Sequence, residues 1–370
     1  MLFIGASADR YGAPRVLSHV ILAMRDEGHI VKCVLHERGP VEEQLRAAGI
    51  DVTVVPTIKL QRSELNVRGT FSRLGNLFKS LKSHMHMLRQ EEPDVVFVNT
   101  IVIPLWTIVA RLAGYRVVCH THELIGDSKL LRRVMYFGLL FSNTTIAVSD
   151  ACRDEILSVY PNLRSRVTVV LNPSFDIRDT LPVDEGHDND IVILGRISPR
   201  KGQHVLLEAL RTGELGPLHL NIHLCGDAFP SPAAQEYADN LFEEFRAIET
   251  AEVHIHGYVD NSAAYRLGGI VIVPSVEPDP CPLVVAEALR AGRTLIASNC
   301  GGVAQLAAGA ALLIPPGDPY ALSRSIHRVI SDASLRSWLR QRTEQRGKML
   351  DTETYFKTME SAICDYGSSK

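Results

Sequence analysis

The sequence lacks an apolar run long enough to cross a lipid bilayer. One apolar stretch extends from Ile101 to Ala110 but ends at Arg111, well short of the ~20 residues that a membrane-spanning helix needs. The chain also begins without a basic leader, and Asp9 and Arg10 soon interrupt its apolar start, so the pattern of a signal peptide is missing. These absences predict a cytoplasmic protein.

Paired cysteines and a strong excess of charge are missing too. The seven cysteines are odd in number and show no C-x-x-C spacing, which is typical of scattered core thiols in a reducing cytosol. The net charge of −3 provides no strong field for nucleic acid. Because 46% hydrophobic and 22% charged residues are ordinary globular values, the composition excludes wholesale disorder.

Short apolar runs instead alternate with longer helical patterns, which is typical of parallel βαβ units. The first half contains seven candidate strands, at residues 2–5, 30–35, 52–55, 95–98, 117–119, 145–148 and 167–171. The second half contains six more, at residues 191–194, 218–225, 253–256, 270–273, 294–297 and 311–314. Since the chain has 370 residues and domains commonly have ~150, we predict two doubly wound domains.

Carboxylates surround the start of a helix in the segment from residue 274 to 302. This helix lies between two short apolar strands. In an open α/β sheet, the loop after such a strand borders the ligand crevice, so Glu277, Asp279 and Glu287 are candidate site residues. Pro282 suits the first helical turn, where free backbone N–H groups favour an anionic or hydroxyl-rich ligand. Two turn acids and one surface glutamate are the simpler alternative.

A second candidate loop lies between Gly195 and Gly202. It follows the predicted strand at residues 191–194 and precedes a helical pattern. A strand, a basic loop bounded by glycines and a helix start together form a phosphate site. In such a loop Arg196 can contact two oxygens, and Lys201 acts as a point charge. A basic loop alone is usually a solvated turn, so the pairing of both segments carries the prediction.

Together the loop GRISPRKG and the segment EPDPCPLVVAE resemble family 4 of the retaining glycosyltransferases. The resemblance extends over most of the chain and is specific in the second half. It implies the GT-B fold, in which two Rossmann-like domains face a central cleft. In that family a GR…KG loop holds the pyrophosphate of a nucleotide sugar, and an E-x7-E segment holds the donor sugar and the ribose.

Carried onto this chain, the resemblance implies that the donor nucleotide sugar binds Gly12, Gly195, Arg196, Lys201, Glu277, Asp279, Pro282, Leu283 and Glu287. Arg196 and Lys201 would hold the diphosphate and Glu287 the ribose hydroxyls. The chain reads D-x7-E, so Asp279 stands where the family has its first glutamate, and Glu277 is a rival two residues earlier. Catalysis is expected to involve Arg196, Lys201, Asp279 and His122.

Composition and the strand pattern set the expected domain boundaries, and the resemblance adds the expected course of the C-terminal tail. Residues 1–182 would form an acceptor-side domain, and the polar stretch 183–190 would be the linker. Residues 191–345 would bind the nucleotide sugar. Residues 346–370 would form a helix that crosses back to the first domain.

Gly12 and His122 are the candidates on loops of the first domain. Gly12 follows the first strand and can adopt backbone angles closed to other residues; the family usually has a Gly-Gly pair here, whereas this chain has Tyr11-Gly12-Ala13. His122 lies in a His-Thr-His-Glu sequence, where the family often places a histidine near the donor sugar. An ordinary loop and a structural histidine are the alternatives. Because side chains alternate along a strand, His120 and His122 share one side, but no third ligand with metal-site spacing accompanies them.

Two regions, residues 59–89 and 129–141, are basic and apolar together. Such faces can lie on an anionic membrane and meet a lipid-linked acceptor. The alternative is that the apolar residues pack in the core while the cations are solvated.

The sequence therefore predicts a metal-independent retaining glycosyltransferase that uses a nucleotide diphosphate sugar and no further cofactor. The expected acceptor is a hydroxyl group of a glycan, a lipid-linked glycan or a small molecule. Peripheral contact of the protein with the inner face of the membrane is compatible with this expectation. Two alternatives remain. One is a nucleotide-sugar epimerase or hydrolase on the same fold, and the other is an inactive glycosyltransferase-like subunit that supports an active partner.

Overall fold

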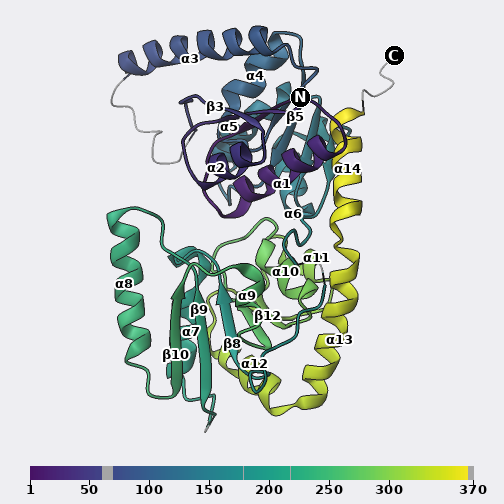
Figure 1. Cartoon of the computed structure of the whole chain (residues 1–370). Coiled ribbons are helices and arrows are strands. Elements are labelled where there is room, and N and C mark those ends of the chain that lie inside the picture. Colours follow the sequence, from purple (N-terminus) through teal and green to yellow (C-terminus); the bar gives the residue numbers. More distant parts are fainter. Residues whose placement is uncertain (61–69, 178, 217, 366–370) are drawn as a thin grey trace. The chain divides into compact units, whose positions relative to one another are not determined.

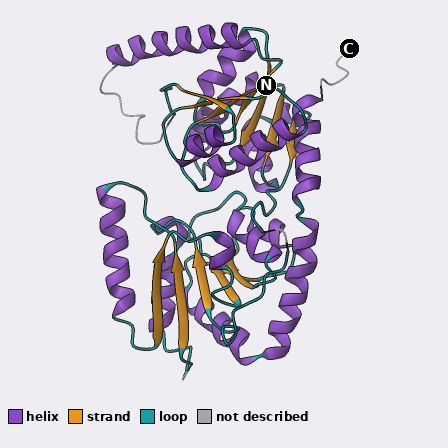
Figure 2. Ribbon diagram, viewed as in Figure 1, coloured by secondary structure: helices purple, strands orange, loops and turns teal. Residues whose placement is uncertain are grey.

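The structure is a computed structural model of the 370-residue chain, and it describes residues 1–60, 70–177, 179–216 and 218–365. Contacts divide the chain into two compact domains (Figure 1). The first comprises Met1–Leu171 together with the segment that begins at Glu353, and the second comprises Asn172–Thr352. In each domain helices flank a sheet (Figure 2).

The first domain contains a seven-stranded sheet in the order β3-β2-β1-β4-β5-β6-β7, and neighbouring strands are parallel. Its strands are β1 (Leu2–Gly5), β2 (Lys32–Leu35), β3 (Asp51–Val54), β4 (Val95–Val98), β5 (Arg116–Thr121), β6 (Thr144–Ala147) and β7 (Val167–Val169). Central strands such as β4, with the sequence VVFV, are fully buried, which is why they are continuous apolar runs. The seven strands predicted from the sequence are confirmed. Successive strands are added on one side of β1 as far as β3 and on the other side from β4 onward, so the strand order switches between β1 and β4, the position at which open α/β sheets bind ligands.

Helices cover this sheet and supply its core. They are α1 (Gly12–Asp26), α2 (Pro40–Ala47), α3 (Thr70–Glu91), α4 (Pro104–Leu112), α5 (Lys129–Met135), α6 (Asp150–Val159) and the 3₁₀ helices η2 (Tyr136–Phe141) and η3 (Pro161–Leu163). Trp106 of α4 and Tyr136 of η2 pack in one apolar cluster with Ile4 and Val98 of the central strands. No helix among the described residues combines the length and the hydropathy needed to cross a membrane.

The second domain contains a six-stranded parallel sheet in the order β10-β9-β8-β11-β12-β13. Its strands are β8 (Ile191–Leu194), β9 (Leu220–Cys225), β10 (Ala251–Gly257), β11 (Ile270–Val273), β12 (Thr294–Ser298) and β13 (Leu312–Ile314). The helices are η4 (Pro199–Lys201), α7 (Gln203–Arg211), α8 (Pro232–Arg246), α9 (Asn261–Ala264), α10 (Leu283–Arg290), α11 (Val303–Ala307), α12 (Pro319–Ser331) and α13 (Ala333–Met349). Helices α7, α8 and α12 bury Leu206, Phe245 and Ile326 in one apolar cluster with Ile222 of β9. The six predicted strands are confirmed, and the strand order switches between β8 and β11.

The stretch predicted as a linker, residues 183–190, is instead part of the second domain. The backbone N–H of Asp184 donates to the carbonyl of Arg266 at 3.1 Å. The guanidinium of Arg293 donates to the carbonyls of Leu181 and Pro182 at 2.8 and 3.0 Å. A polar composition predicts a loop, but it does not reveal that the backbone of the loop is bonded to one domain. The first domain therefore ends before residue 172, earlier than expected.

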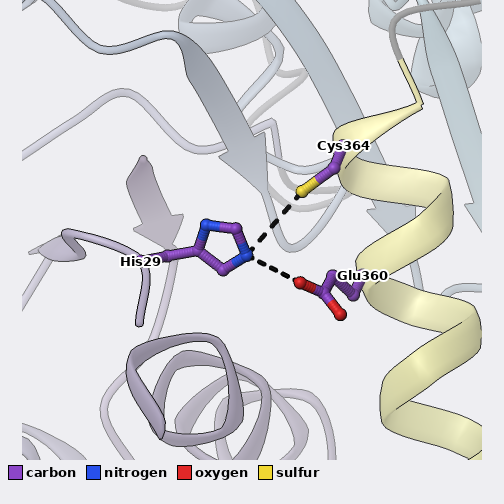
Figure 3. Close-up of side chains that lie close together, drawn as sticks. All are labelled: His29, Glu360 and Cys364. Carbon is purple, nitrogen blue, oxygen red and sulfur yellow. Dashed lines mark hydrogen bonds and ion pairs between the residues drawn. The ribbon is translucent and has the colours of Figure 1, made fainter. Parts of the chain in front are cut away.

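The helical tail changes domain later than expected. Helix α13 stays with the second domain because Gly347 lies against α10: a Cβ there would be 2.5 Å from the carbonyl oxygen of Leu289. Helix α14 (Thr352–Cys364) follows and packs on the first domain. Figure 3 shows its contact with the segment that follows α1, where His29 Nε2 lies 2.8 Å from Glu360 Oε1 and 4.0 Å from Cys364 Sγ.

Candidate active site

Glycines bring the loops at the carboxyl ends of neighbouring strands of the second domain into backbone contact. Gly202 has φ +75°, and a Cβ there would lie 1.9 Å from the carbonyl oxygen of Pro274, just after β11. Gly301, after β12, has φ +63° and approaches the carbonyl of Asp279 in the same way, at 2.1 Å. Only glycine permits such approaches at these backbone angles. We refer to residues 195–202, 274–282 and 299–302 as the loop cluster.

Arg196 enters the loop cluster directly after β8. Its guanidinium carbon lies 5.1 Å from the centre of the Phe229 ring, a cation–π distance. Its backbone carbonyl accepts a hydrogen bond from Gln203 Nε2 at 3.0 Å. The loop backbone is therefore fixed to the start of α7, and the half-buried guanidinium is stacked on an aromatic ring.

Lys201 and Asp279 form an ion pair within the loop cluster. Lys201 is the last residue of η4, and its Nζ donates to Asp279 Oδ2 at 2.6 Å. Burial acts to raise the pKa of Asp279, but Lys201 and Arg200 outweigh this effect and hold the pKa below its ordinary value. The carboxyl group is therefore ionised at neutral pH. Two predicted site residues that are far apart in the sequence are thus in direct contact.

Glu277 differs from Asp279 in its surroundings. Its side chain is exposed, whereas Asp279 is buried. Pro282 stands one position before the first helical turn, as the N-cap of α10, and Leu283 is the first helical residue. The turn that joins Asp279 to α10 therefore fixes Asp279 relative to the start of this helix, and Glu277 lies outside that turn.

Glu287 lies inside the second domain rather than on its surface. It is fully buried on α10, and its Oε2 accepts hydrogen bonds from Asn261 Nδ2 and from the hydroxyl of Tyr265, both at 3.0 Å. The alternative of a surface helix glutamate is wrong. A buried carboxylate needs polar partners of this kind. Asn261 of α9 and Tyr265, which directly follows α9, supply them.

His122 lies just after β5 in the first domain, next to residues from two other loops. Its Nε2 is 3.1 Å from Asn99 Oδ1, and Asn99 Nδ2 donates to the carbonyl of Ala13 at 2.8 Å. Since the amide oxygen only accepts, His122 carries its proton on Nε2, and Nδ1 retains a lone pair. Burial lowers the pKa of His122 to about 3, so the ring is neutral at physiological pH. Asn99 thus connects His122 to the loop that contains Gly12.

His120 shares one side of β5 with His122, as the alternation predicts, but its environment differs. The two ring centres are 4.1 Å apart, and Phe97 contacts the His120 ring edge-on at 5.8 Å. His120 is fully buried, and burial lowers its pKa well below the ordinary value. These surroundings are those of a core residue.

Gly12 is exposed at the start of α1 and has φ +53°, a left-handed angle that favours glycine. The N–H of the preceding Tyr11 donates to Asp9 Oδ1 at 2.9 Å. The loop therefore makes a tight turn between β1 and α1, and it lies beside Asn99 through Ala13. A cavity of about 1170 Å³ elsewhere in this domain, between α14 and the strands β5 to β7, includes neither Gly12 nor His122.

The two regions that are basic and apolar differ in structure. In residues 59–89, His84 stacks on Trp106 at 3.7 Å, and Leu88 is buried in the core. Residues 61–69 lie outside the described residues, as do the side chains of residues 70–76 and 78. Residues 129–141, in contrast, expose three large apolar side chains, which are Leu130, Val134 and Phe137.

Two protein-family profiles match the chain. The profile described as "Glycosyl transferases group 1" matches residues 188–332, within the second domain. The profile described as "Glycosyltransferase Family 4" matches residues 11–173, nearly all of it within the first domain. The chain belongs to glycosyltransferase family 4.

Two curated relatives show how far this family 4 chain resembles proteins of named activity. The lipopolysaccharide 1,2-N-acetylglucosaminetransferase of Salmonella typhimurium is 28% identical over 228 residues, which cover 58% of this chain and 57% of that protein. The alpha-maltose-1-phosphate synthase of Mycobacterium tuberculosis is 24% identical over 203 residues, which cover 50% of this chain and 51% of that protein. The chain thus spans little more than half the length of these relatives.

Solved structures show the fold of this family 4 chain. The Anabaena protein HepE in complex with UDP-glucose has a TM-score of 0.80 at 20% identity, with 98% of this chain and 99% of that chain covered. The lipopolysaccharide outer core galactosyltransferase WaaB, in its apo form, has a TM-score of 0.69 at 18% identity, with 98% and 99% covered. The predicted GT-B fold, with its two Rossmann-like domains, is confirmed.

The sequence analysis of this family 4 chain did not identify three residues that contact candidate site residues. Asn99 contacts His122, Asn261 contacts Glu287, and Phe229 stacks on Arg196. Asn99 directly follows a predicted strand, so its position at the carboxyl end of the sheet was available as a signal. Phe229 lies in a loop and Asn261 begins α9, and neither follows a comparable pattern.

Proposed function

We propose that this protein transfers a sugar from a nucleotide diphosphate sugar to a hydroxyl group of a glycan or lipid-linked acceptor, with retention of anomeric configuration. The observation that carries the proposal is the contact between Lys201 and Asp279, at 2.6 Å. The loop that contains Lys201 also contains Arg196. This arrangement provides two cations for a diphosphate and one carboxylate for a sugar hydroxyl. The neighbours support a nucleotide sugar donor, because HepE was solved with UDP and with UDP-glucose.

In this proposal the protein stabilises the leaving group through fixed charges. The bond between the anomeric carbon and the diphosphate oxygen breaks, and its electron pair leaves with the diphosphate. Arg196 and Lys201 face that developing charge, a role that electrostatic preorganisation performs well and that requires no metal ion. The acceptor hydroxyl attacks the same face of the sugar, and its proton passes to the departing diphosphate.

The remaining candidates take roles that match their surroundings. Asp279 is the proposed donor-sugar ligand, because it is ionised and fixed by Lys201, whereas Glu277 is exposed. Glu287 is the proposed ribose ligand. His122, neutral through burial, is proposed to contact the sugar or the acceptor.

Calorimetry with UDP, GDP and ADP tests the diphosphate assignment. Arg196→Ala should weaken the best of these ligands by about 10 to 100-fold, since one charged hydrogen bond is worth ~1.5–3 kcal/mol. Arg211→Ala is the control, because Arg211 is an exposed cation at the end of α7, outside the loop cluster, and should change the affinity less than about threefold. Equal affinity of the native protein and the Arg196→Ala variant would remove the assignment.

The exposed surface of α5 and η2 supports peripheral contact with a membrane as a further part of the proposal. Leu130, Val134 and Phe137 are 75%, 40% and 47% exposed, and the exposed cations Lys129 and Arg133 lie beside them in the sequence. Spacings of four and three residues place the apolar side chains on one side. Apolar side chains and cations together favour anionic lipid.

Cosedimentation with phosphatidylglycerol vesicles tests this contact. We expect binding at low salt that weakens at high salt, with each cation contributing about 1 kcal/mol at most. Phe137→Ser should reduce binding, while Leu112→Ser, at a residue that is 73% exposed on α4, should not. Absence of binding at low salt would favour a soluble acceptor.

A further inference from the structure

Histidines gather on one edge of the second domain, away from the residues discussed so far. The group comprises His187, Asp190, His223, His254 and His256, and we refer to it as the histidine cluster. His223 lies in β9, and His254 and His256 lie in β10, the edge strand of the sheet. His187 and Asp190 precede β8.

Strand alternation places the histidines of β9 and β10 on the same face. In β9, Ile222 and Leu224 are buried in the core with α7 and α8, so His223 between them projects from the opposite face. The register pairs His254 with His223, and the two rings stack at 4.8 Å. A sheet face that would otherwise be apolar therefore carries imidazole rings.

A hydrogen-bonded turn adds two further donor atoms. The backbone N–H of Asp190 donates to the carbonyl of His187 at 3.1 Å, and His187 Nδ1 is hydrogen-bonded to Asp190 Oδ2. Asp190 Oδ2 also lies 3.9 Å from His223 Nε2. His187, Asp190 and His223 each offer one potential ligand atom, and these three atoms all lie within 4.8 Å of one another.

The buried ring of His223 has a nitrogen without a hydrogen-bond partner. His223 is 5% exposed, and within the described part of the chain its Nε2 accepts and donates no hydrogen bond. Its other nitrogen, Nδ1, lies 3.0 Å from His256 Nε2. If His223 donates this hydrogen bond, Nε2 has a lone pair that points toward a carboxylate oxygen, and a cation between the two atoms satisfies both.

Two neighbouring side chains hold the donor atoms in place. His256 engages His223 Nδ1, and Asn221 Nδ2 donates to Asp190 Oδ1 at 3.0 Å, which leaves Oδ2 for a further partner. Ligands of bound metals are typically oriented by such second hydrogen bonds. A tetrahedral zinc ion with bonds of about 2.0–2.2 Å separates its ligand atoms by roughly 3.3 Å, so small side-chain shifts would complete the geometry.

We propose that His187, Asp190 and His223 bind a divalent cation of the zinc class. Two imidazoles and one carboxylate suit Zn²⁺ rather than Mg²⁺ or Ca²⁺, which prefer oxygen ligands. Asp190 precedes β8, and the loop cluster begins after it, so the four-residue strand separates them by about 13 Å. The cation would therefore attach residues 184–190 to the sheet edge without contacting the donor site.

A second group of potential ligands, His29, Glu360 and Cys364 of the first domain (Figure 3), makes a weaker case. All three of its residues are partly exposed, whereas His223 is buried and has a ring nitrogen without a hydrogen-bond partner among the described residues. This group has to be removed from the test, because it also offers a thiol.

The test is a zinc titration of the full chain in a Cys364→Ser background, which removes the thiol of the second group, after treatment with a chelator. Affinity is measured by competition with a chromophoric chelator, and Co²⁺ absorption reports a four-coordinate site. We expect one bound ion per chain. His187→Ala should weaken zinc binding at least about tenfold. His187 is half-exposed, so the His187→Ala variant should fold. A second variant, His223→Asn, removes the buried ligand and should also weaken zinc binding.

His219→Ala is the matched control, because His219 is exposed one residue before β9 and lies outside the cluster. Its zinc affinity should remain within about twofold of the background variant, as expected for a surface substitution. The proposal is overturned if the background variant binds no zinc, or if His187→Ala and His219→Ala bind zinc equally well.

Discussion

Replacing Lys201 with methionine removes the cation of a nearly buried ion pair and keeps most of its side-chain volume. In the native protein the Nζ–Oδ2 distance to Asp279 is 2.6 Å, and the two side chains are 22% and 10% exposed. The substitution leaves the carboxylate in place with its principal cation gone. Removing one partner of a fully buried pair costs ~3–5 kcal/mol. Because Lys201 retains some exposure to water, we expect about 2–3 kcal/mol at pH 7.

The loss should depend on pH in a defined direction. In the native protein, the pKa of Asp279 is below its ordinary value, so the pair stabilises the fold above that value and loses its effect as the pH falls through the lowered pKa. Without Lys201 the effect of burial dominates, and the pKa of Asp279 should rise above the ordinary value of 3.8. The difference in stability between variant and native protein should therefore shrink as the pH falls from 7 toward 4.

Hydrogen exchange under increasing urea, read by mass spectrometry on peptides from α10 and β11, measures this stability within the second domain. Arg211→Met is the matched control, since the ion pair between Arg211 and Glu244, at 2.9 Å, lies in the same domain but its side chains are 49% and 53% exposed. That variant should lose less than about 1 kcal/mol. A loss of equal size for both substitutions, or a loss for Lys201→Met that is the same at pH 7 and pH 4, would refute the reasoning.

Three further predictions concern the proposed donor site. Asp279→Asn should lower kcat/KM for the sugar nucleotide by about 10 to 100-fold with little change in affinity for free nucleotide, and Glu277→Gln should lower kcat/KM much less. Steady-state kinetics and calorimetry measure the two quantities, and a larger loss of kcat/KM for Glu277→Gln would assign the sugar contact to Glu277. His122→Ala should reduce turnover more than nucleotide affinity, whereas His120→Ala should mainly lower the melting temperature; normal turnover of the first variant would remove His122 from the site. Glu287→Gln should weaken nucleotide binding but hardly alter binding of pyrophosphate, and equal losses for both ligands would contradict a ribose contact.

Sequence patterns predicted the sheets because parallel strands are buried on both faces. Strands β4, β8 and β11 are fully or almost fully buried, so each is a continuous apolar run. The linker prediction was wrong because the feature that fixes residues 183–190 to the second domain is a set of backbone contacts. Backbone hydrogen bonds such as that from Asp184 to Arg266 leave no pattern in the side chains.

The candidate site was predictable as a set of loops but not as a set of contacts. Residue type and strand ends indicated Lys201 and Asp279 separately, whereas their ion pair depends on how the glycines allow the loops after β8 and β11 to meet. The burial of Glu287 and its hydrogen bond from Tyr265 depend on the packing of α9 and α10. A one-dimensional pattern does not specify such packing.

Turnover of a panel of sugar nucleotides tests the central claim most directly. The native protein and the Arg196→Ala variant are incubated with UDP-, GDP- and ADP-sugars and a mixture of hydroxyl acceptors, and the products are analysed by NMR. We predict release of one nucleoside diphosphate, formation of a glycoside with the anomeric configuration of the donor, and a loss of about 10 to 100-fold in the variant. Interconversion of the donor sugars without glycoside formation, or no consumption of any donor, would contradict the proposed glycosyl transfer.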